Sequence, residues 1–240
     1  MNIAMLIAGG VGNRMHQDIP KQFLNVYDKP VIIYTLEAFQ KHPAIDAITV
    51  VCLEGWENIL RAYCSQFDIT KLESVCPGGA CGQESIYNGL KDIAKRHDDN
   101  DIVLIHDANR PLVTADIIDD NIRICQQHRN AITVIPCAEA VLKTSDGISS
   151  DVQVPRDNLK RTQTPQAFIL SDIISAHEEA KEKGITNSVA SCTLYIELGR
   201  KVFFSHGSEK NLKLTTVDDL DIFKALLRSR RSEWIKTIRD

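Results

Sequence analysis

The chain of 240 residues fits one domain of ordinary size, and its 43% apolar content can support a complete hydrophobic core. A net charge of −4 excludes a general nucleic-acid or membrane-surface binder, so any phosphate-binding cations must be local. The first apolar run is too short to span a membrane and lacks a cleavable signal pattern, which predicts a cytoplasmic protein. The 7 cysteines have no zinc-ligand spacing and predict reduced, mostly buried thiols.

Apolar runs alternate with amphipathic stretches over the first 136 residues. We expect strands at 2–7, 47–53, 102–105 and 131–136, a short strand ending near 77, and helices at 31–41, 56–67, 83–96 and 115–128. This alternation predicts an α/β domain with a largely parallel sheet, in which ligands bind beyond the C-terminal ends of the strands. Loops 8–14, 78–85 and 106–110 all follow strands, so one shared ligand would explain all three.

The pattern changes between residues 137 and 158. Segments 141–144 and 152–154 flank Ser145-Asp146-Gly147, which predicts a hairpin. We expect residues 137–158 to form a dimerisation arm; a plain surface hairpin is the alternative. Beyond the arm, the sequence predicts helices ending at 183 and covering 189–197, with Gly199 closing the second. Strands at 202–204 and 213–214 and a helix at 216–227 follow, the last beginning with a near capping box of Thr216 and Asp219.

A glycine loop follows the first strand. It reads Ala8-Gly9-Gly10-Val11-Gly12-Asn13-Arg14-Met15, and Pro20-Lys21-Gln22-Phe23 comes shortly after. Glycines let the backbone approach a ligand closely, and Arg14 and Lys21 are side chains suited to phosphate. The spacing is neither that of a P-loop nor that of a dinucleotide fingerprint. A tight strand-to-helix turn with solvated cations is the alternative.

Asp107 is a candidate metal ligand because it ends an apolar strand. A carboxylate there suits Mg²⁺ beside a triphosphate, since Mg²⁺ prefers oxygen ligands. A helix cap or an ion pair with Arg110 is the alternative. His106 is either a base or a packed histidine, and Ser85 either contacts a base or ribose or caps the third helix. No Ser/His/Asp set or glutamate pair stands out, which argues against a hydrolase.

Two further cations each allow two roles on the sequence alone. Lys213 lies in a predicted strand, where a surface lysine is the ordinary reading. Arg156 follows a proline, and either a ligand-binding or a solvated role fits it.

A series of motifs occurs in one order along nearly the whole chain. It resembles the family of 2-C-methyl-D-erythritol 4-phosphate and ribitol 5-phosphate cytidylyltransferases. The motifs are Leu6-Ile7-Ala8-Gly9-Gly10-Val11-Gly12-Asn13-Arg14-Met15, Pro20-Lys21-Gln22-Phe23, Gly78-Gly79, Ser85, His106-Asp107-Ala108-Asn109-Arg110-Pro111, Gln163-Thr164-Pro165-Gln166 and Asn211-Leu212-Lys213-Leu214-Thr215.

The resemblance implies a fold and an activity. The fold is a three-layer Rossmann-like nucleotidyltransferase domain over residues 1–240, with a mainly parallel sheet and a protruding β-arm. The activity is transfer of CMP from CTP to a polyol phosphate with release of pyrophosphate, with Mg²⁺, in a homodimer. The resemblance also implies a role for individual residues. CTP would be contacted by Ala8, Gly9, Gly10, Gly79, Ser85, Asp107 and Arg110, and Asp107 would also bind the metal. Arg14, Lys21 and Lys213 would be the catalytic cations, and the acceptor would be contacted by Ala190 and, across the dimer interface, by Arg156.

The acceptor is the open part of this interpretation. The family commonly has Thr-Asp where this chain has Val189-Ala190, and Arg where Gly82 stands. Ala80 and Gly55-Trp56 are more like the ribitol branch. We therefore expect ribitol 5-phosphate as acceptor, giving CDP-ribitol for cell-surface polymers, with 2-C-methyl-D-erythritol 4-phosphate of isoprenoid synthesis as the alternative.

Two rival functions belong to other classes. A nucleotide-sugar-dependent glycosyltransferase usually needs an Asp-x-Asp metal motif, and none follows a central strand here; Asp219-Leu220-Asp221 lies in a predicted helix. A CTP-binding protein without activity is the second rival, for which Ala190 is the only hint.

Overall fold

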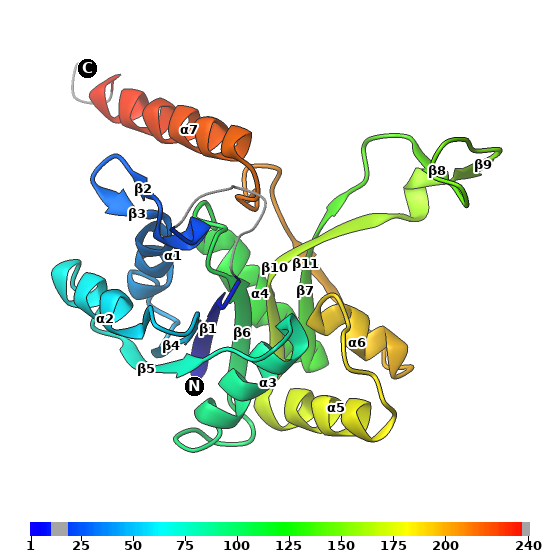
Figure 1. The fold of residues 1–240 in the computed structure, drawn as a ribbon, viewed down its shortest axis with the longest axis horizontal. Helices are drawn as coiled ribbons and strands as arrows, with labels where there is room; N and C mark the ends of the chain where they lie inside the picture. The colour runs from blue at the N-terminus through cyan, green and yellow to red at the C-terminus, as the bar shows by residue number, and fades with distance from the viewer. Residues whose placement is uncertain (11–18, 237–240) are drawn as a thin grey trace.

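The computed structural model describes residues 1–10 and 19–236, with side chains up to residue 229 (Figure 1). Its centre is a seven-stranded sheet in the order β11-β7-β10-β6-β1-β4-β5. The strands are β1 (Asn2–Ala8), β4 (Ala47–Cys52), β5 (Leu72–Pro77), β6 (Ile102–Asp107), β7 (Asn130–Pro136), β10 (Lys160–Ile169) and β11 (Phe204–His206). Only β10 runs antiparallel to its neighbours in this sheet. The predicted α/β fold with a mainly parallel sheet is confirmed.

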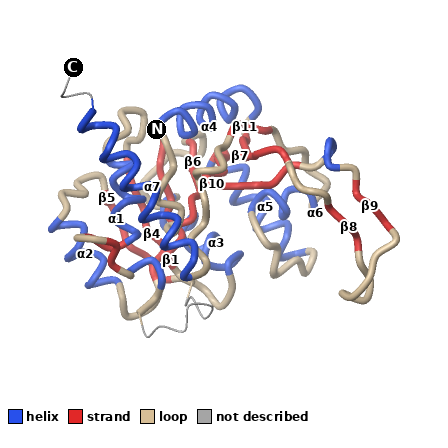
Figure 2. The backbone as a smooth tube through the Cα atoms, turned by 90° about the horizontal axis from the view of Figure 1, so that it is seen from above, coloured by secondary structure: helices blue, strands red, loops and turns tan. Residues whose placement is uncertain are grey.

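Helices cover both faces of the sheet, as Figures 1 and 2 show. They are α1 (Val31–Gln40), α2 (Glu57–Gln66), α3 (Gly82–Ile93), α4 (Ala115–His128), α5 (Leu170–Glu182), α6 (Ser191–Glu197) and α7 (Val217–Lys236). One apolar cluster joins the sheet to α1, α2 and α4, and a second joins its other face to α3, α5 and α6. The result is the three-layer arrangement. None of the described helices combines the length and apolarity that crossing a bilayer requires.

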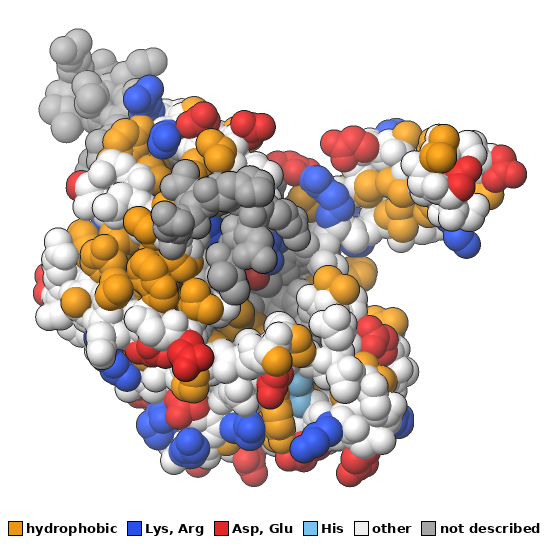
Figure 3. Space-filling model, in the orientation of Figure 1, with side chains coloured by type: hydrophobic (Ala, Val, Ile, Leu, Met, Phe, Trp, Pro, Cys, Tyr) orange, Lys and Arg blue, Asp and Glu red, His pale blue; other side chains and the backbone are white. Residues whose placement is uncertain are grey.

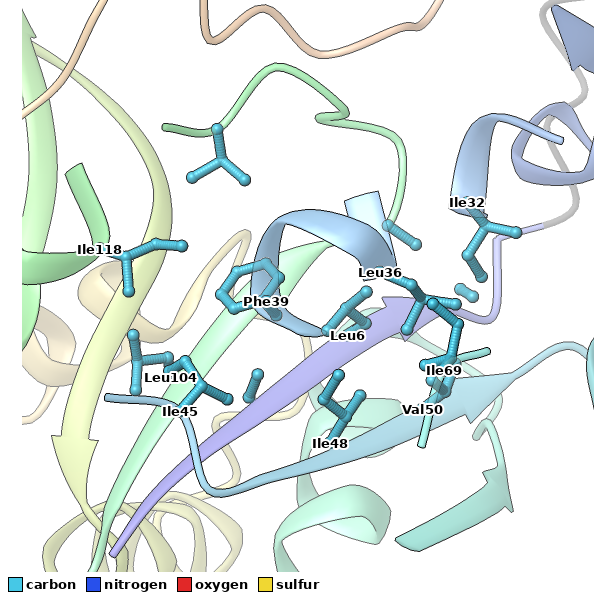
Figure 4. Packing of buried hydrophobic residues seen from close by; sticks show 14 of the residues in the cluster. Leu6, Ile32, Leu36, Phe39, Ile45, Ile48, Val50, Ile69, Leu104 and Ile118 are labelled. Atoms are coloured by element: carbon cyan, nitrogen blue, oxygen red, sulfur yellow. The ribbon is translucent and has the colours of Figure 1, made fainter. Parts of the chain in front are cut away.

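The first strand shows why the buried strands read as continuous apolar runs. Leu6 belongs to the first cluster, where it packs with Leu36, Phe39 and Leu104 (Figure 4), and Met5 belongs to the second. Successive side chains of a strand point to opposite faces, so a strand covered on both faces needs apolar residues at every position.

Two small hairpins leave the central sheet. β2 (Asn25–Val26) pairs with β3 (Lys29–Pro30), and β8 (Val141–Lys143) pairs with β9 (Val152–Val154). The second hairpin projects from the body on two long connections (Figure 1), with Gly147 at a φ of 73° in its turn. The hairpin predicted within residues 137–158 is confirmed, whereas its role in dimerisation stays a prediction.

The C-terminal helix packs on the edge of the molecule that carries the β2–β3 hairpin. Phe223 of α7 is buried with Val26, Leu112 and Leu214 in a third apolar cluster. The predicted capping box is confirmed, because Asp219 N–H donates to Thr216 Oγ1 at 3.3 Å and Thr216 N–H donates to Asp219 Oδ2 at 2.8 Å. The helix itself is longer than expected and ends at Lys236 rather than at residue 227.

Three other element predictions need correction. The helix expected at 189–197 begins only at Ser191, because Ala190 has an extended backbone and forms its N-cap; Gly199 closes it with a φ of 74°, as predicted. The strand expected at 202–204 lies at 204–206, where it pairs with β7. The strand expected at 213–214 is absent from the described structure. Leu214 N–H donates instead to the carbonyl of Asn109 in a loop.

Candidate active site

A pocket of about 660 Å³ lies at the C-terminal ends of β1 and β6. The three loops that the sequence singled out all contribute to its wall, as does β10. Ten of the predicted site residues line it: Ala8, Gly9, Gly10, Lys21, Gly79, Ser85, Asp107, Arg110, Ala190 and Lys213. Arg14 lies outside the described residues. The pocket therefore gathers side chains from parts of the chain that are far apart in sequence.

Asp107 is held between two cations. Its Oδ1 lies 2.9 Å from Lys213 Nζ, and its Oδ2 accepts a hydrogen bond from Arg110 Nε at 3.0 Å. Burial by itself would raise the pKa of Asp107, but Lys213 and Arg110 outweigh it and hold the pKa below its usual range. The carboxylate is therefore charged at neutral pH. The ion pair with Arg110 that the sequence left open is present.

The loop that carries Lys213 is fastened on both sides. Asn109 Nδ2 donates to the carbonyl of Leu214 at 2.5 Å, and Leu214 N–H returns a bond to the carbonyl of Asn109 at 2.9 Å. Arg110 Nη1 donates to the carbonyl of Asn211 at 2.7 Å. The Asn211 side chain is fully buried and donates to the carbonyl of Thr164 at 2.9 Å. These bonds fix the backbone on either side of Lys213 to the loop after β6 and to β10.

His106 is a buried packing residue rather than a free base. Its side chain is 0% exposed, and the ring meets Phe39 edge-on with centroids 5.0 Å apart. Its Nε2 lies 3.1 Å from the carbonyl of Arg110, and its Nδ1 lies 3.1 Å from Thr164 Oγ1. Burial lowers the pKa of His106 to about 4, so the imidazole is neutral at pH 7.

Gln22 fastens the start of the glycine loop. Its side chain is 2% exposed, and its Nε2 donates to the carbonyls of Ala8 at 2.7 Å and Gly10 at 3.2 Å. The next residue, Phe23, is buried and stacks on Trp56 with ring centroids 4.6 Å apart. These two anchors hold the short 3₁₀ turn Lys21–Phe23, so that Lys21 lines the pocket.

Ser85 organises the second glycine loop. Its Oγ accepts the N–H of Gly79 at 2.9 Å and donates to the carbonyl of Cys81 at 2.9 Å. Ser85 lies near the start of α3, but the N-cap is Cys81 and no side chain caps this helix, so Ser85 is not its cap. A contact of Ser85 with base or ribose stays a prediction. A Cβ at Gly79 would lie 2.7 Å from Glu84 Cβ, which explains the glycine there.

The remaining wall comes from β10 and the segment before α6. Val189, Ala190 and Ser191 line this side of the pocket together with Thr162 and Gln166. Val189 is 95% exposed, whereas Ser191 is buried.

Arg156 does not line the pocket. It lies in the 3₁₀ turn Arg156–Asn158 at the base of the arm, and its Nη1 donates to the carbonyl of Ala138 at 2.8 Å. Within one chain, the structure does not bring this predicted acceptor contact to the other site residues.

Sequence reasoning missed the side chains that support the site. Gln22, Asn109 and Asn211 are buried amides that each bond to backbone far away in sequence. Asn109 and Asn211 lie one or two positions from a predicted charged residue, inside the same motifs. A buried polar residue in such a motif is the signal that could have found them.

Comparison with known proteins agrees with this geometry. Residues 2–229 match the family model described as IspD: 2-C-methyl-D-erythritol 4-phosphate cytidylyltransferase. A Vibrio parahaemolyticus protein named ribitol-5-phosphate cytidylyltransferase is 44% identical over 234 residues, which cover 97% of this chain and 98% of that protein. A Clostridium botulinum protein named 2-C-methyl-D-erythritol 4-phosphate cytidylyltransferase is 38% identical over 228 residues, covering 94% and 97%. The solved structure of 4-diphosphocytidyl-2C-methyl-D-erythritol synthase from Anaerococcus prevotii superposes with a TM-score of 0.79 at 25% identity, covering 95% and 98%.

Proposed function

This chain belongs to the 2-C-methyl-D-erythritol 4-phosphate cytidylyltransferase family, and on that premise we propose that it transfers CMP from CTP to ribitol 5-phosphate. One observation carries the proposal: Lys21, Asp107 and Lys213 converge with the glycine loops on a single pocket. The ribitol acceptor is supported by the 44% identical relative of that name, against 38% for the relative named for the other acceptor. The products are CDP-ribitol and pyrophosphate.

The proposed reaction needs alignment and charge stabilisation more than a base. An oxygen of the acceptor's phosphate attacks the α-phosphorus of CTP, and the bond from that phosphorus to the oxygen bridging to the β-phosphate breaks. The attacking oxygen is already anionic near neutral pH, so no proton has to be removed. Lys21 and Lys213, with Arg14 as the resemblance implies, stabilise the charge that develops on the phosphates. A neutral, fully bonded His106 suits such a site.

The donor set suits a Mg²⁺ shared with the nucleotide. Within the described residues no group of three or more histidine, cysteine or acidic side chains could hold a metal alone. Asp107 supplies one charged oxygen donor, and Mg²⁺ is commonly held by one or two carboxylates plus substrate phosphates. When bound there, the ion would neutralise charge on the triphosphate.

We infer that the protein is a homodimer joined through the arm at residues 137–158. The hairpin exposes large apolar side chains, Leu142 at 62% and Ile148 at 93%. Figure 3 shows hydrophobic side chains on the surface of the projecting arm. A second subunit would cover them, and Arg156 at the arm's base would then reach the partner's pocket as the resemblance implies. Leu142→Asp should shift the protein to monomers in sedimentation velocity. Ile222→Asp, at a residue 51% exposed on α7, is the control and should not.

A cytoplasmic location is part of the proposal. It is supported by the thiols, because all seven cysteines are free and five of them are buried. Unpaired cysteines are typical of proteins kept in a reducing compartment.

The test is pyrophosphate release with CTP, Mg²⁺ and each acceptor in turn. We expect a kcat/KM at least about tenfold higher with ribitol 5-phosphate, a difference of about 1.4 kcal/mol in transition-state binding. The reverse preference would assign 2-C-methyl-D-erythritol 4-phosphate as acceptor instead. If the protein binds CTP by calorimetry but turns over neither acceptor, it is not this enzyme.

A further inference from the structure

The turn that carries Asp107 and Arg110 is tied at both ends to the imidazole of His106. Arg110 N–H closes the turn on the carbonyl of Asp107 at 3.0 Å. At its start, Asp107 N–H donates to Thr164 Oγ1 at 3.0 Å, and that hydroxyl lies 3.1 Å from His106 Nδ1. At its end, the carbonyl of Arg110 lies 3.1 Å from His106 Nε2. Two side chains thus connect both ends of the turn.

For a neutral ring, the chemistry of the partners fixes the direction of each bond. A carbonyl oxygen only accepts, so His106 Nε2 carries the ring proton and donates to Arg110. The neutral ring then has a lone pair on Nδ1, which accepts from the hydroxyl of Thr164. The same hydroxyl oxygen accepts the N–H of Asp107. The tautomer is thereby assigned from the bonding pattern.

The turn is also the part of the pocket wall that places two charged groups. Arg110 Nε and Asp107 Oδ2 are 3.0 Å apart, and Asp107 Oδ1 meets Lys213. A rotation of the peptide at either end of the turn would move the carboxylate relative to both cations. Both of those peptides are held by the His106–Thr164 pair.

We propose that His106 and Thr164 are positioning residues for the CMP-transfer reaction, holding the turn at 107–110 so that Asp107 and Arg110 keep their places in the pocket. The proposal rests on the proposed function. His106 acts through the turn, since its side chain is 0% exposed and both ring nitrogens are engaged. It therefore has no free nitrogen with which to serve as a general base.

Apolar packing alone does not require a histidine here. Phe39 covers one side of the ring, and a leucine or phenylalanine would fill a similar volume. Only a neutral imidazole offers a donor on one side and an acceptor on the other at the separation of Thr164 and the carbonyl of Arg110. The choice of residue thus matches the bonding pattern rather than the volume.

Substitutions can separate the two ends of this connection. Thr164→Val removes the hydroxyl but keeps the shape, and we expect kcat to fall on the order of 10- to 100-fold, as for groups that orient catalytic ligands. Thr164→Ser restores the hydroxyl and should keep kcat within about threefold of the wild type, the expectation for an intact connection. His106→Asn keeps an amide near Nδ1 and His106→Gln one near Nε2. Each should lose less than His106→Leu, which keeps neither.

A matched control separates positioning from stability. Thr49 is fully buried in the same sheet, on β4, whereas Thr164 is only partly buried. The Thr49 hydroxyl contacts Ser74 Oγ at 3.1 Å, away from the pocket. Thr49→Val should lower the melting temperature without changing kcat. If Thr164→Val lowers only the melting temperature, with kcat equal to that of Thr164→Ser, the positioning role is wrong.

A readout that does not depend on turnover completes the test. Nitrogen-15 NMR of histidine-labelled wild type should give His106 the shifts of a neutral ring protonated at Nε2 at pH 7, and Thr164→Val should displace the Nδ1 resonance. A ring protonated at Nδ1 would overturn the assignment whatever the activity. Absence of wild-type turnover with the expected tautomer would contradict the proposed function and leave the hydrogen-bond connection itself intact.

Discussion

Replacing Lys213 with methionine should separate catalysis from stability. Lys213 Nζ lies 2.9 Å from Asp107 Oδ1, but Asp107 Oδ2 keeps its bond from Arg110 Nε at 3.0 Å. The carboxylate is therefore not left unpaired. Because the Lys213 side chain is 41% exposed, solvent screens the pair. The substitution should cost about 1 kcal/mol or less of unfolding free energy.

The same substitution removes a cation from the pocket in which phosphates are proposed to bind. The loss of one electrostatic donor at a reacting centre costs on the order of 10²- to 10³-fold in kcat, or about 2.7–4 kcal/mol. The expected effect on the transition state is thus several times the effect on the fold. Neutral methionine keeps most of the apolar stem, so packing changes little.

The assay is steady-state pyrophosphate release, with urea unfolding of the same samples. Lys210→Met is the matched control, since Lys210 is an exposed lysine in the same loop that does not line the pocket. Lys210→Met should keep kcat within about twofold of the wild-type value, because an exposed charge outside the pocket contributes little. If Lys213→Met retains more than about a third of kcat, or loses several kcal/mol of stability, the reasoning fails.

Three further results are expected. Gly89→Ala should destabilise the fold by about 1–3 kcal/mol in urea unfolding, because the added Cβ would lie 2.5 Å from Met5 Sδ. Gly82→Ala on the same helix is the control and should be tolerated, because its Cβ would meet nothing within 4 Å. Gln22→Met should raise the KM for CTP about tenfold in the pyrophosphate assay, since the carbonyls it holds at the glycine loop lose their donor; an unchanged KM would remove its role. The free energy of unfolding should fall as the pH drops from 6.5 towards 4, because burial lowers the pKa of His177 from 6.5 to about 4 and the unfolded chain binds that proton first. His177→Phe should reduce this slope by up to about 1.4 kcal/mol per pH unit, and an equal slope in both proteins would contradict it.

The elements that sequence patterns predicted well are those in which local and tertiary signals agree. β1 and β4 are mostly apolar because helices cover both of their faces. The start of α7 is set by a capping box that two nearby residues make by themselves. In such segments the neighbours in sequence already contain the decisive interaction.

The parts that could not be predicted depend on distant partners. β10 contains Pro165 between polar residues, and it is a strand because β6 and β7 pair with it on either side. The sequence predicted a strand at Leu214 because the residue is apolar. Its backbone pairs instead with Asn109, which lies more than a hundred positions away. The pocket's cations could be predicted because Lys and Arg are residue types suited to phosphate. The buried amides that fix the pocket loops could not, because their bonds are to backbone far away in sequence.

The two cations on Asp107 are held differently, and this suggests how the site accepts an anionic substrate. Arg110 is fixed by a second bond to the carbonyl of Asn211, and its side chain is 12% exposed. Lys213 is 41% exposed, and its ammonium group bonds to Asp107 Oδ1 at 2.9 Å. A lysine is a compact point charge on a flexible stem, so exchanging one oxygen anion for another costs it little. We therefore expect an incoming phosphate to draw Lys213 from Asp107 while Arg110 stays, which leaves one carboxylate oxygen free at the moment the substrate arrives.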